Sequence, residues 1–217
     1  MKCIRRLCKV STEWSSGLAY AVGIIATDGN LSPDSRHVNI TSKDKQILLN
    51  CKKCLGLENK IGRKSRAGFS EKKYYVLQFG DKNFYEFLNH IGLTAAKSKT
   101  IGCVNVPSTY FKDFLRGCID GDGSISVAVH PQSRRPQLRI RICSASITFL
   151  QFLKKEILKM AAVKGGWIYT SPKKIYTLSF GKTDSIIILN LLYYSSVKYY
   201  LVRKYKIAKK FLNGRVA

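Results

Sequence analysis

The sequence predicts an α+β fold built from two pseudo-symmetric αββαββα halves that pack against each other through one helix from each half. Three observations predict this fold. An apolar helix ending in Asp-Gly occurs twice, with the final acids at Asp28 and Asp122, 94 positions apart. A strand with the pattern Tyr-x-Leu-x-Phe-Gly also occurs twice, at residues 75–80 and 176–181. Between these landmarks, helical and alternating apolar patterns follow in the same order in both copies.

The first half is expected to span residues 13–101. Its first helix runs through Leu18 and Val22 to Asp28, and Ser15 or Ser16 is expected to cap its free N–H groups. The remaining elements are, in order, a loop at 30–34, a strand at 36–41, a helix at 43–55, a strand at 59–66, a turn at 67–73, a strand at 74–79 and a helix at 84–91.

The second half is expected to span residues 107–213 and to repeat this order. Pro107 prevents a continuous helix across the connection, and Ser108 is the expected cap of the second motif helix. The elements that follow are strands at 124–129 and 138–143 around a polar turn at 131–136, a helix at 146–160, strands at 166–170 and 175–180, and two C-terminal helices.

The ends of the two motif helices are the candidate site. Gly23 and Gly117 lie at matching positions, where the lack of a side chain allows two helix backbones to cross closely. Such a crossing brings Asp28 and Asp122 together. Each acid lies at the negative end of its helix dipole, which is unfavourable by up to ~1 kcal/mol. Because two adjacent carboxylates repel unless a cation lies between them, the pattern favours a metal site.

Composition indicates the class of partner. The chain of 217 residues has a formal net charge of +25 and 45% hydrophobic residues, so it can bury a core and still attract a polyanion. Nucleic acid fits this charge better than a membrane surface, and no apolar stretch approaches the ~20 residues needed to span a bilayer. The seven scattered cysteines favour a reducing compartment. Cys51 and Cys54 fall on the apolar stripe of a helix, which favours buried thiols over the alternative of a zinc site.

The two motifs resemble those of LAGLIDADG homing endonucleases in their single-chain form. Leu-Arg-Gly-Cys-Ile-Asp-Gly-Asp-Gly at residues 115–123 is a close match, and Ala-Val-Gly-Ile-Ile-Ala-Thr-Asp-Gly at residues 21–29 departs from it at Ala26. In the family the earlier acid position is mainly structural and the later acid binds metal, so the resemblance points to Asp28 and Asp122. It also implies extra ligands from the carbonyls near Ala26, Thr27 and Gly121.

The resemblance implies hydrolysis of both strands of duplex DNA with 3′ overhangs. Mg²⁺ is the expected cofactor, Mn²⁺ should substitute for it, and Ca²⁺ should support binding without cleavage. Lys43 resembles a family lysine near the scissile phosphate, and its partner in the repeat is Ala145. Lys97 and Lys204 resemble a second family lysine, one in each half. These three lysines are the expected basic catalytic residues.

Alternating strands are expected to bury one face on helices and to leave the other free, as a saddle for duplex DNA. The alternative for these free faces is an ordinary solvated surface. Basic residues at 60–66, 134–135, 203–204 and 206 would hold phosphates. The candidate DNA-binding residues are Asn39, Thr41, Tyr74, Val76 and Gln78 in the first half, and Ser124, Ser126, Ala128, His130, Arg139, Arg141, Ile175, Thr177 and Ser179 in the second.

The expected function is therefore a site-specific, intron-type DNA endonuclease. It should act as a monomer on a long asymmetric site, without a membrane, in the cytoplasm or nucleoid, or in an organelle matrix. An RNA-binding intron maturase on the same scaffold is the main alternative, although such a protein need not retain both acids. A DNA-binding regulator is the third, but such relatives usually add a helix-turn-helix domain, for which 217 residues leave no room.

Overall fold

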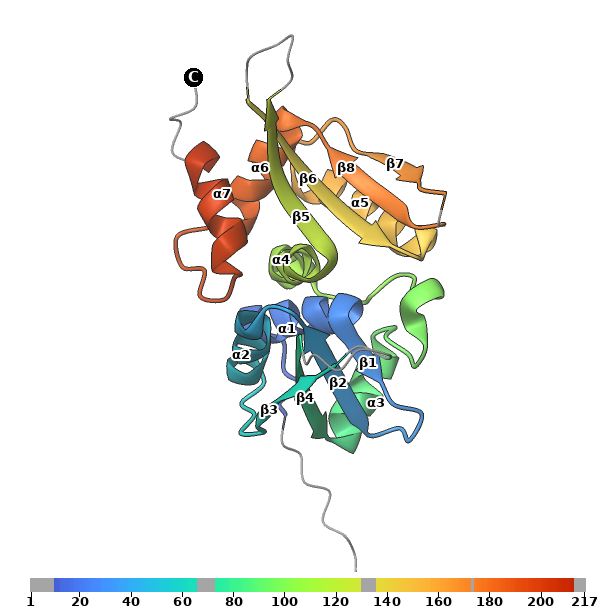
Figure 1. Ribbon diagram of the computed structural model, residues 1–217. Coiled ribbons are helices and arrows are strands. Elements are labelled where there is room, and N and C mark those ends of the chain that lie inside the picture. The colour runs from blue at the N-terminus through green and yellow to red at the C-terminus, as the bar shows by residue number, and fades with distance from the viewer. Residues whose placement is uncertain (1–9, 66–72, 130–135, 173, 213–217) are drawn as a thin grey trace, which may run out of the picture.

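The computed structural model describes residues 10–65, 73–129, 136–172 and 174–212. It has an α+β fold with two pseudo-symmetric halves, one above the other in Figure 1, as the sequence predicts. The first half contains α1 (Ser16–Asp28), β1 (Gly29–Leu31), β2 (His37–Ser42), α2 (Lys45–Cys54), β3 (Ile61–Lys64), β4 (Tyr74–Gly80) and α3 (Lys82–His90). The second contains α4 (Phe111–Asp122), β5 (Gly123–Val129), β6 (Pro136–Ser144), α5 (Ile147–Met160), β7 (Trp167–Thr170), β8 (Tyr176–Phe180), α6 (Lys182–Leu192) and α7 (Val202–Leu212). The connection between the halves holds two short 3-10 turns, η1 (Lys97–Lys99) and η2 (Ser108–Tyr110).

Each half forms one antiparallel sheet with the same strand order. The order is β1-β2-β4-β3 in the first half and β5-β6-β8-β7 in the second. Strand β2 alternates strictly between buried and half-buried residues, and its buried side chains include Val38 and Ile40. In β4, Leu77 and Phe79 lie on the same buried face, as the alternation predicts. One face of each sheet therefore belongs to the core and the other is free of it.

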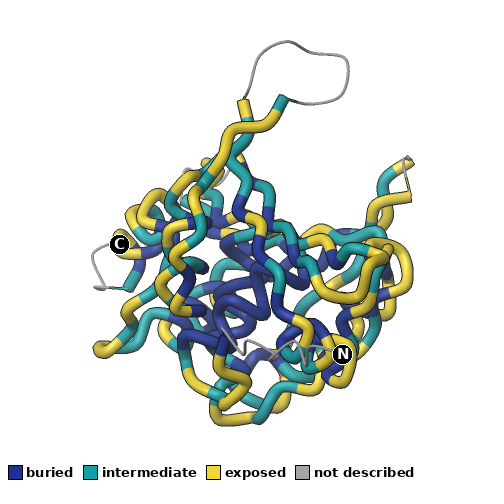
Figure 2. Tube along the Cα trace, turned by 90° about the horizontal axis from the view of Figure 1, so that it is seen from below, coloured by how far each residue is buried: buried dark blue, intermediate teal, exposed yellow. Residues whose placement is uncertain are grey.

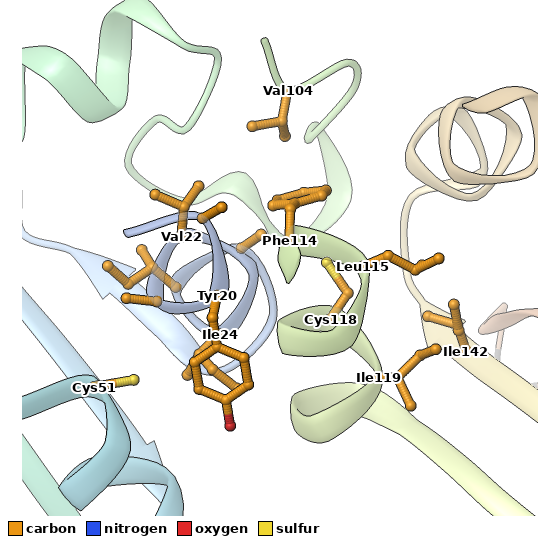
Figure 3. Close-up of a cluster of buried hydrophobic side chains, with 14 of the residues drawn as sticks. Tyr20, Val22, Ile24, Cys51, Val104, Phe114, Leu115, Cys118, Ile119 and Ile142 are labelled. Atoms are coloured by element: carbon orange, nitrogen blue, oxygen red, sulfur yellow. The ribbon is translucent and has the colours of Figure 1, made fainter. Parts of the chain in front are cut away.

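The motif helices α1 and α4 cross at their glycines. A Cβ atom on Gly23 would lie 2.2 Å from the Phe114 carbonyl oxygen, and one on Gly117 would lie 2.2 Å from the Tyr20 carbonyl oxygen. No other residue could occupy either position without moving the helices apart. The buried segments gather in the centre of the molecule in Figure 2, and Figure 3 shows side chains of both helices meeting there.

The helix caps and loops agree with those predicted from the sequence, with two exceptions. The Ser15 hydroxyl accepts a hydrogen bond from the Leu18 N–H at 3.1 Å, so Ser15 is the cap of α1. The prediction that Ser108 caps the second motif helix is wrong: Ser108 begins η2, and α4 starts three residues later with no side-chain cap. The expected loop at 30–34 is partly wrong as well, because Asn30 and Leu31 pair with β2. The expected turns at 67–73 and 131–136 lie almost entirely outside the described residues.

Helix α7 belongs to the second half but is bonded to the first. The Asn50 side chain of α2 donates a hydrogen bond to the Tyr200 carbonyl at 3.1 Å, and the Val202 N–H donates to Gln46 Oε1 at 3.1 Å. Arg203 makes two-pronged contact with the Asp44 carboxylate, with a closest distance of 2.7 Å. These bonds hold the start of α7 against α2 and its N-cap residue Asp44. No helix among the described residues is long and apolar enough to cross a membrane.

Candidate active site

The two predicted metal acids are the last residues of the two motif helices. Asp28 ends α1 and Asp122 ends α4, and the chain turns at once into a strand in both halves. A Cβ atom on the following residue would clash with the helix it leaves: at Gly29 it would lie 2.6 Å from the Ile25 carbonyl oxygen, and at Gly123 2.6 Å from the Ile119 Cα atom. The Asp-Gly sequence is thus needed to turn the backbone directly after the acid.

The last turns of α1 and α4 touch each other. A Cβ atom on Gly121 would lie 2.1 Å from Thr27 Oγ1 and 3.7 Å from Asp28 Oδ2. Burial and then the Asp122 charge raise the pKa of Asp28 to about 7. Burial also raises the pKa of Asp122, and the ammonium groups of Lys204 and Lys97 oppose that rise. The two carboxylates therefore share one electrostatic environment, as the crossing of the helices predicts.

Ser42 is a site residue that the sequence analysis missed. It lies at the end of β2 on the buried side, and its hydroxyl hydrogen-bonds to Asp28, which lowers the pKa of that carboxyl against the larger effects of burial and Asp122. The Asp44 N–H donates to the same hydroxyl at 3.3 Å. The signal was present in the alternation of β2, which assigns Ser42 to the core face with Val38 and Ile40. A polar residue on a core face needs a polar partner.

Lys97 and Lys204 lie at the two helix ends, buried, and bind backbone carbonyls there. The Lys204 ammonium donates to the carbonyls of Ile119, Asp120 and Gly123 at 2.6, 2.8 and 2.6 Å, and the Lys97 ammonium donates to the Gly29 carbonyl. Burial lowers the pKa of both lysines to about 8, although the nearby aspartates oppose it. Both therefore satisfy carbonyls at the negative ends of the motif helices and place positive charge beside the acids.

Lys43 is placed differently from the other two lysines. Its side chain is exposed, and its Nζ atom lies 5.6 Å from the centroid of the Tyr74 ring. Asp44 is bound to Arg203, so the turn between β2 and α2 is held against α7. Arg203 and Lys204 are hence not free phosphate-binding cations as expected: Arg203 is paired with Asp44, and Lys204 is 2% exposed.

Asp120, the earlier acid of the second motif, is buried and hydrogen-bonded within the protein. Asp120 is fully buried, and its Oδ2 atom accepts hydrogen bonds from the Tyr20 hydroxyl at 3.0 Å and from the Leu201 N–H at 2.8 Å. Burial raises its pKa to about 6, while the Lys204 charge opposes that shift. The matching residue of the first motif, Ala26, is buried and apolar. Asp120 of α4 therefore links α1 to Leu201, the residue that directly precedes α7.

The residues present fit a divalent metal with oxygen ligands. Asp28 and Asp122 supply two carboxylates, and neither forms an ion pair among the described residues. The lysines occupy the carbonyls of residues 29, 119, 120 and 123. The predicted carbonyl ligands of Ala26, Thr27 and Gly121 are not among these. Carboxylate and carbonyl oxygens are the donors that Mg²⁺ prefers in proteins.

The strand register of the first sheet places the predicted DNA-binding residues on one face. Asn39 pairs with Gln78 and Thr41 pairs with Val76, so their side chains share one face across β2 and β4. Tyr74 pairs with Lys64 on the neighbouring edge strand. Asn30, which is exposed and pairs with Asn39, lies on the same face and was missed because β1 is too short to show alternation.

The free face of the second sheet differs from expectation at two positions. Ser124 and Ser126 pair with Arg141 and Arg139, and Ala128 follows along β5, as predicted. Thr177 and Ser179 share this face by register but are only 8% and 1% exposed, so the expectation that they are free is wrong. Ser179 lies between the longer side chains of Arg141 and Trp167 on the adjacent strands, which accounts for its burial. Ile175 is exposed one residue before β8, and His130 lies outside the described residues, as do Arg134 and Arg135.

Comparisons with known proteins agree with this arrangement. Residues 18–92 match the family model of the LAGLIDADG-like domain. No curated protein sequence matches the chain. Full-length DUF199/WhiA from Thermatoga maritima matches with a TM-score of 0.57 and 15% identity over 95% of this chain, which spans 63% of that protein.

Two homing endonuclease structures match over most of both chains. Mesophilic variants of the homing endonuclease I-DmoI give a TM-score of 0.58 and 16% identity over 89% of this chain and 98% of that one. The LAGLIDADG homing endonuclease I-GzeII, in complex with its DNA target, gives 0.59 and 14% over 93% and 89%. At these identities the likeness establishes the fold. The chain thus carries a LAGLIDADG-like domain at residues 18–92 and has the two-motif LAGLIDADG fold, which confirms the resemblance seen in the sequence.

Proposed function

We propose that this chain is a site-specific endonuclease that cuts both strands of duplex DNA with divalent metal held by Asp28 and Asp122. The observation that carries the proposal is the glycine-to-glycine crossing of α1 and α4, which brings the two carboxylates to one place. Homing endonucleases of the same fold have been crystallised with target DNA, and I-DmoI with DNA and Mn. The formal net charge of +25 fits the same partner.

The free faces of the two sheets bind the duplex in this proposal. Polar residues of the first sheet and the Arg139 and Arg141 forks of the second would contact base edges, while surrounding lysines and arginines hold phosphates. The saddle is made by one chain with two different halves, so the site is long and asymmetric and the protein acts as a monomer. The compartment is one that contains DNA, whether cytoplasm, nucleoid or organelle matrix.

The residues around the helix ends have separate roles. Asp28 and Asp122, with the carbonyls of Ala26, Thr27 and Gly121, hold Mg²⁺ or Mn²⁺. Such an ion would act as a Lewis acid toward the phosphate and lower the pKa of bound water. Lys97 and Lys204 fix the turns that carry the acids and add positive charge beside the phosphate. In this proposal Lys43, which is exposed directly after β2 and lies near the Tyr74 ring, contacts the DNA itself.

Selection from a randomised duplex library tests this function. The full chain is incubated with the library in Mg²⁺, Mn²⁺, Ca²⁺ or EDTA, and newly formed ends are captured and sequenced. We expect one family of sites cut in Mg²⁺ and Mn²⁺ with 3′ overhangs, and binding without cutting in Ca²⁺. Binding of duplex DNA without cleavage in any metal would instead indicate a DNA-binding regulator. Preferential binding of structured intron RNA over duplex DNA would indicate a maturase.

A further inference from the structure

The edge strand of the second sheet exposes two large aromatic side chains that the proposed mechanism does not use. Trp167 and Tyr169 of β7 are 46% and 44% exposed. A tryptophan or tyrosine buries a large apolar area when it is covered, so two of them left half-exposed side by side on one strand need an explanation. We call this pair the aromatic strip.

The strand register places the aromatic strip on the free face of the sheet. Trp167 pairs with Ser179, and Tyr169 pairs with Thr177. Ser179 in turn pairs with Arg141, and Arg141 pairs with Ser124, so one row of side chains runs from β5 to Trp167 across all four strands. The intervening residues of β8, Leu178 and Phe180, are fully buried on the opposite face. The strip therefore extends the surface that carries Arg139 and Arg141.

The first sheet has no such strip at the matching place. In the repeat, Val76 corresponds to Thr177, and Val76 pairs with Gly62 where Thr177 pairs with Tyr169. Lys60, which directly precedes β3, occupies the position of Trp167 and is exposed. A glycine and a lysine thus stand in one half where two aromatic residues stand in the other. The two ends of the saddle differ in chemistry and would favour different base sequences.

A DNA partner offers one apolar group to such a strip from the major groove. Among the base edges of that groove, only thymine presents a methyl group, and the arginines beside the strip fit guanine edges and phosphates. We propose, on the basis of the DNA-binding function proposed above, that Trp167 and Tyr169 contact thymine methyl groups at the outer end of the half-site under the second sheet. They are specificity-determining residues rather than catalytic ones, because β7 is the strand farthest from β5 and the Asp122 turn in the strand order.

Replacement of thymine by uracil tests this contact, because it removes only the methyl group. The selected target is synthesised with each thymine in turn replaced by deoxyuridine, and the Kd of the full chain is measured in Ca²⁺ by fluorescence anisotropy. A contacted methyl group should contribute about fourfold in affinity, equivalent to ~0.8 kcal/mol. We expect this loss for at least one thymine under the second sheet, and no further loss from uracil at that position in the variants Trp167→Ala or Tyr169→Ala.

The matched control is Leu158→Ala. Leu158 is 40% exposed but lies on α5, one of the helices of the second half, and its replacement should leave the uracil penalty intact. Uracil tolerated at every position, an equal penalty in wild type and Trp167→Ala, or a target without thymine at that end would overturn the inference while DNA binding stands. Loss of self-association in Trp167→Ala would assign the strip to a second copy of the chain. Failure of the wild type to bind any duplex would overturn the proposed function as well.

Discussion

Replacing Lys204 by methionine separates a structural role of this lysine from a purely catalytic one. Its ammonium donates to three carbonyls in the last turn of α4 and the start of β5, and the side chain is 2% exposed. Methionine keeps most of the volume but takes the ammonium donor away from the carbonyls of Asp120 and Gly123, whereas the Ile119 carbonyl keeps its hydrogen bond from the Gly123 N–H. It also removes the positive charge beside Asp120. Each unpaired buried acceptor costs about 1–3 kcal/mol, and relief of the buried ammonium offsets part of that, so we expect the free energy of unfolding to fall by roughly 2–4 kcal/mol.

Urea denaturation followed by circular dichroism measures this loss. Lys206→Met is the matched control, because Lys206 is exposed on the same helix and its replacement should change stability by less than about 0.5 kcal/mol. The Lys204 variant should also lose cleavage, since the turn that carries Asp122 is no longer fixed. A variant that is as stable as the wild type but does not cleave would refute the assignment of Lys204 to the helix end and make it a substrate contact alone.

Three further predictions follow from the same site. Gly117→Ala should lower the free energy of unfolding by about 3 kcal/mol or more, because the added methyl group would lie 2.2 Å from the Tyr20 carbonyl oxygen and force the two helices apart. Unchanged urea denaturation would show that the crossing is loose. The pKa of Asp28 is raised to about 7 from its ordinary value, so the folded state binds the proton more tightly and this group's contribution to stability should decline as pH rises from about 4 to 7. Asp28→Asn should abolish that part of the pH dependence of stability. In the wild type, added Mg²⁺ should recover the stability that is lost above pH 7. An identical pH profile in the variant and the wild type would contradict the assignment. Lys43→Ala should remove or shrink an unequal rate of strand cutting, seen as nicked plasmid, because only Ala145 stands at its counterpart position; a wild type with no nicked species would contradict this.

The repeat and its chemistry were readable from the sequence because they depend on local pattern. The Asp-Gly ends and the alternation of β2 and β4 act through their own backbone or immediate neighbours. Gly23 and Gly117 contact each other's helix from far apart in the chain, and only their matching positions in the repeat made that contact readable. The short strand β1 was not readable, since three residues carry no periodicity and pair only because β2 lies beside them. The Ser108 cap failed because the chain forms a 3-10 turn before α4 begins.

The contacts of the site depended on residues far apart in the chain. The sequence analysis identified Lys97 and Lys204 as site residues, but their carbonyl partners are 68 and 81–85 positions away and become visible only once α7 and η1 are placed. The sequence predicts a free cation at Arg203, but Asp44, 159 positions away, pairs with it. Burial of Ser179 likewise depends on the adjacent strands. Sequence patterns predict which face of a helix or strand a side chain lies on. Its hydrogen-bond or ion-pair partner and its burial can be read only from the folded chain.

The most direct measurement of the central claim compares cleavage and binding in the two acid variants. The full chain, Asp28→Asn and Asp122→Asn are assayed on the selected duplex in Mg²⁺ for cutting and in Ca²⁺ for affinity. Each asparagine preserves shape and removes one ionised metal ligand, so neither variant should cut both strands, while both should bind within about tenfold of the wild type. Glu86→Gln, at an exposed acid of α3, serves as the control and should cut normally. Robust double-strand cleavage by Asp122→Asn would contradict the assignment of the two helix-end acids to the metal.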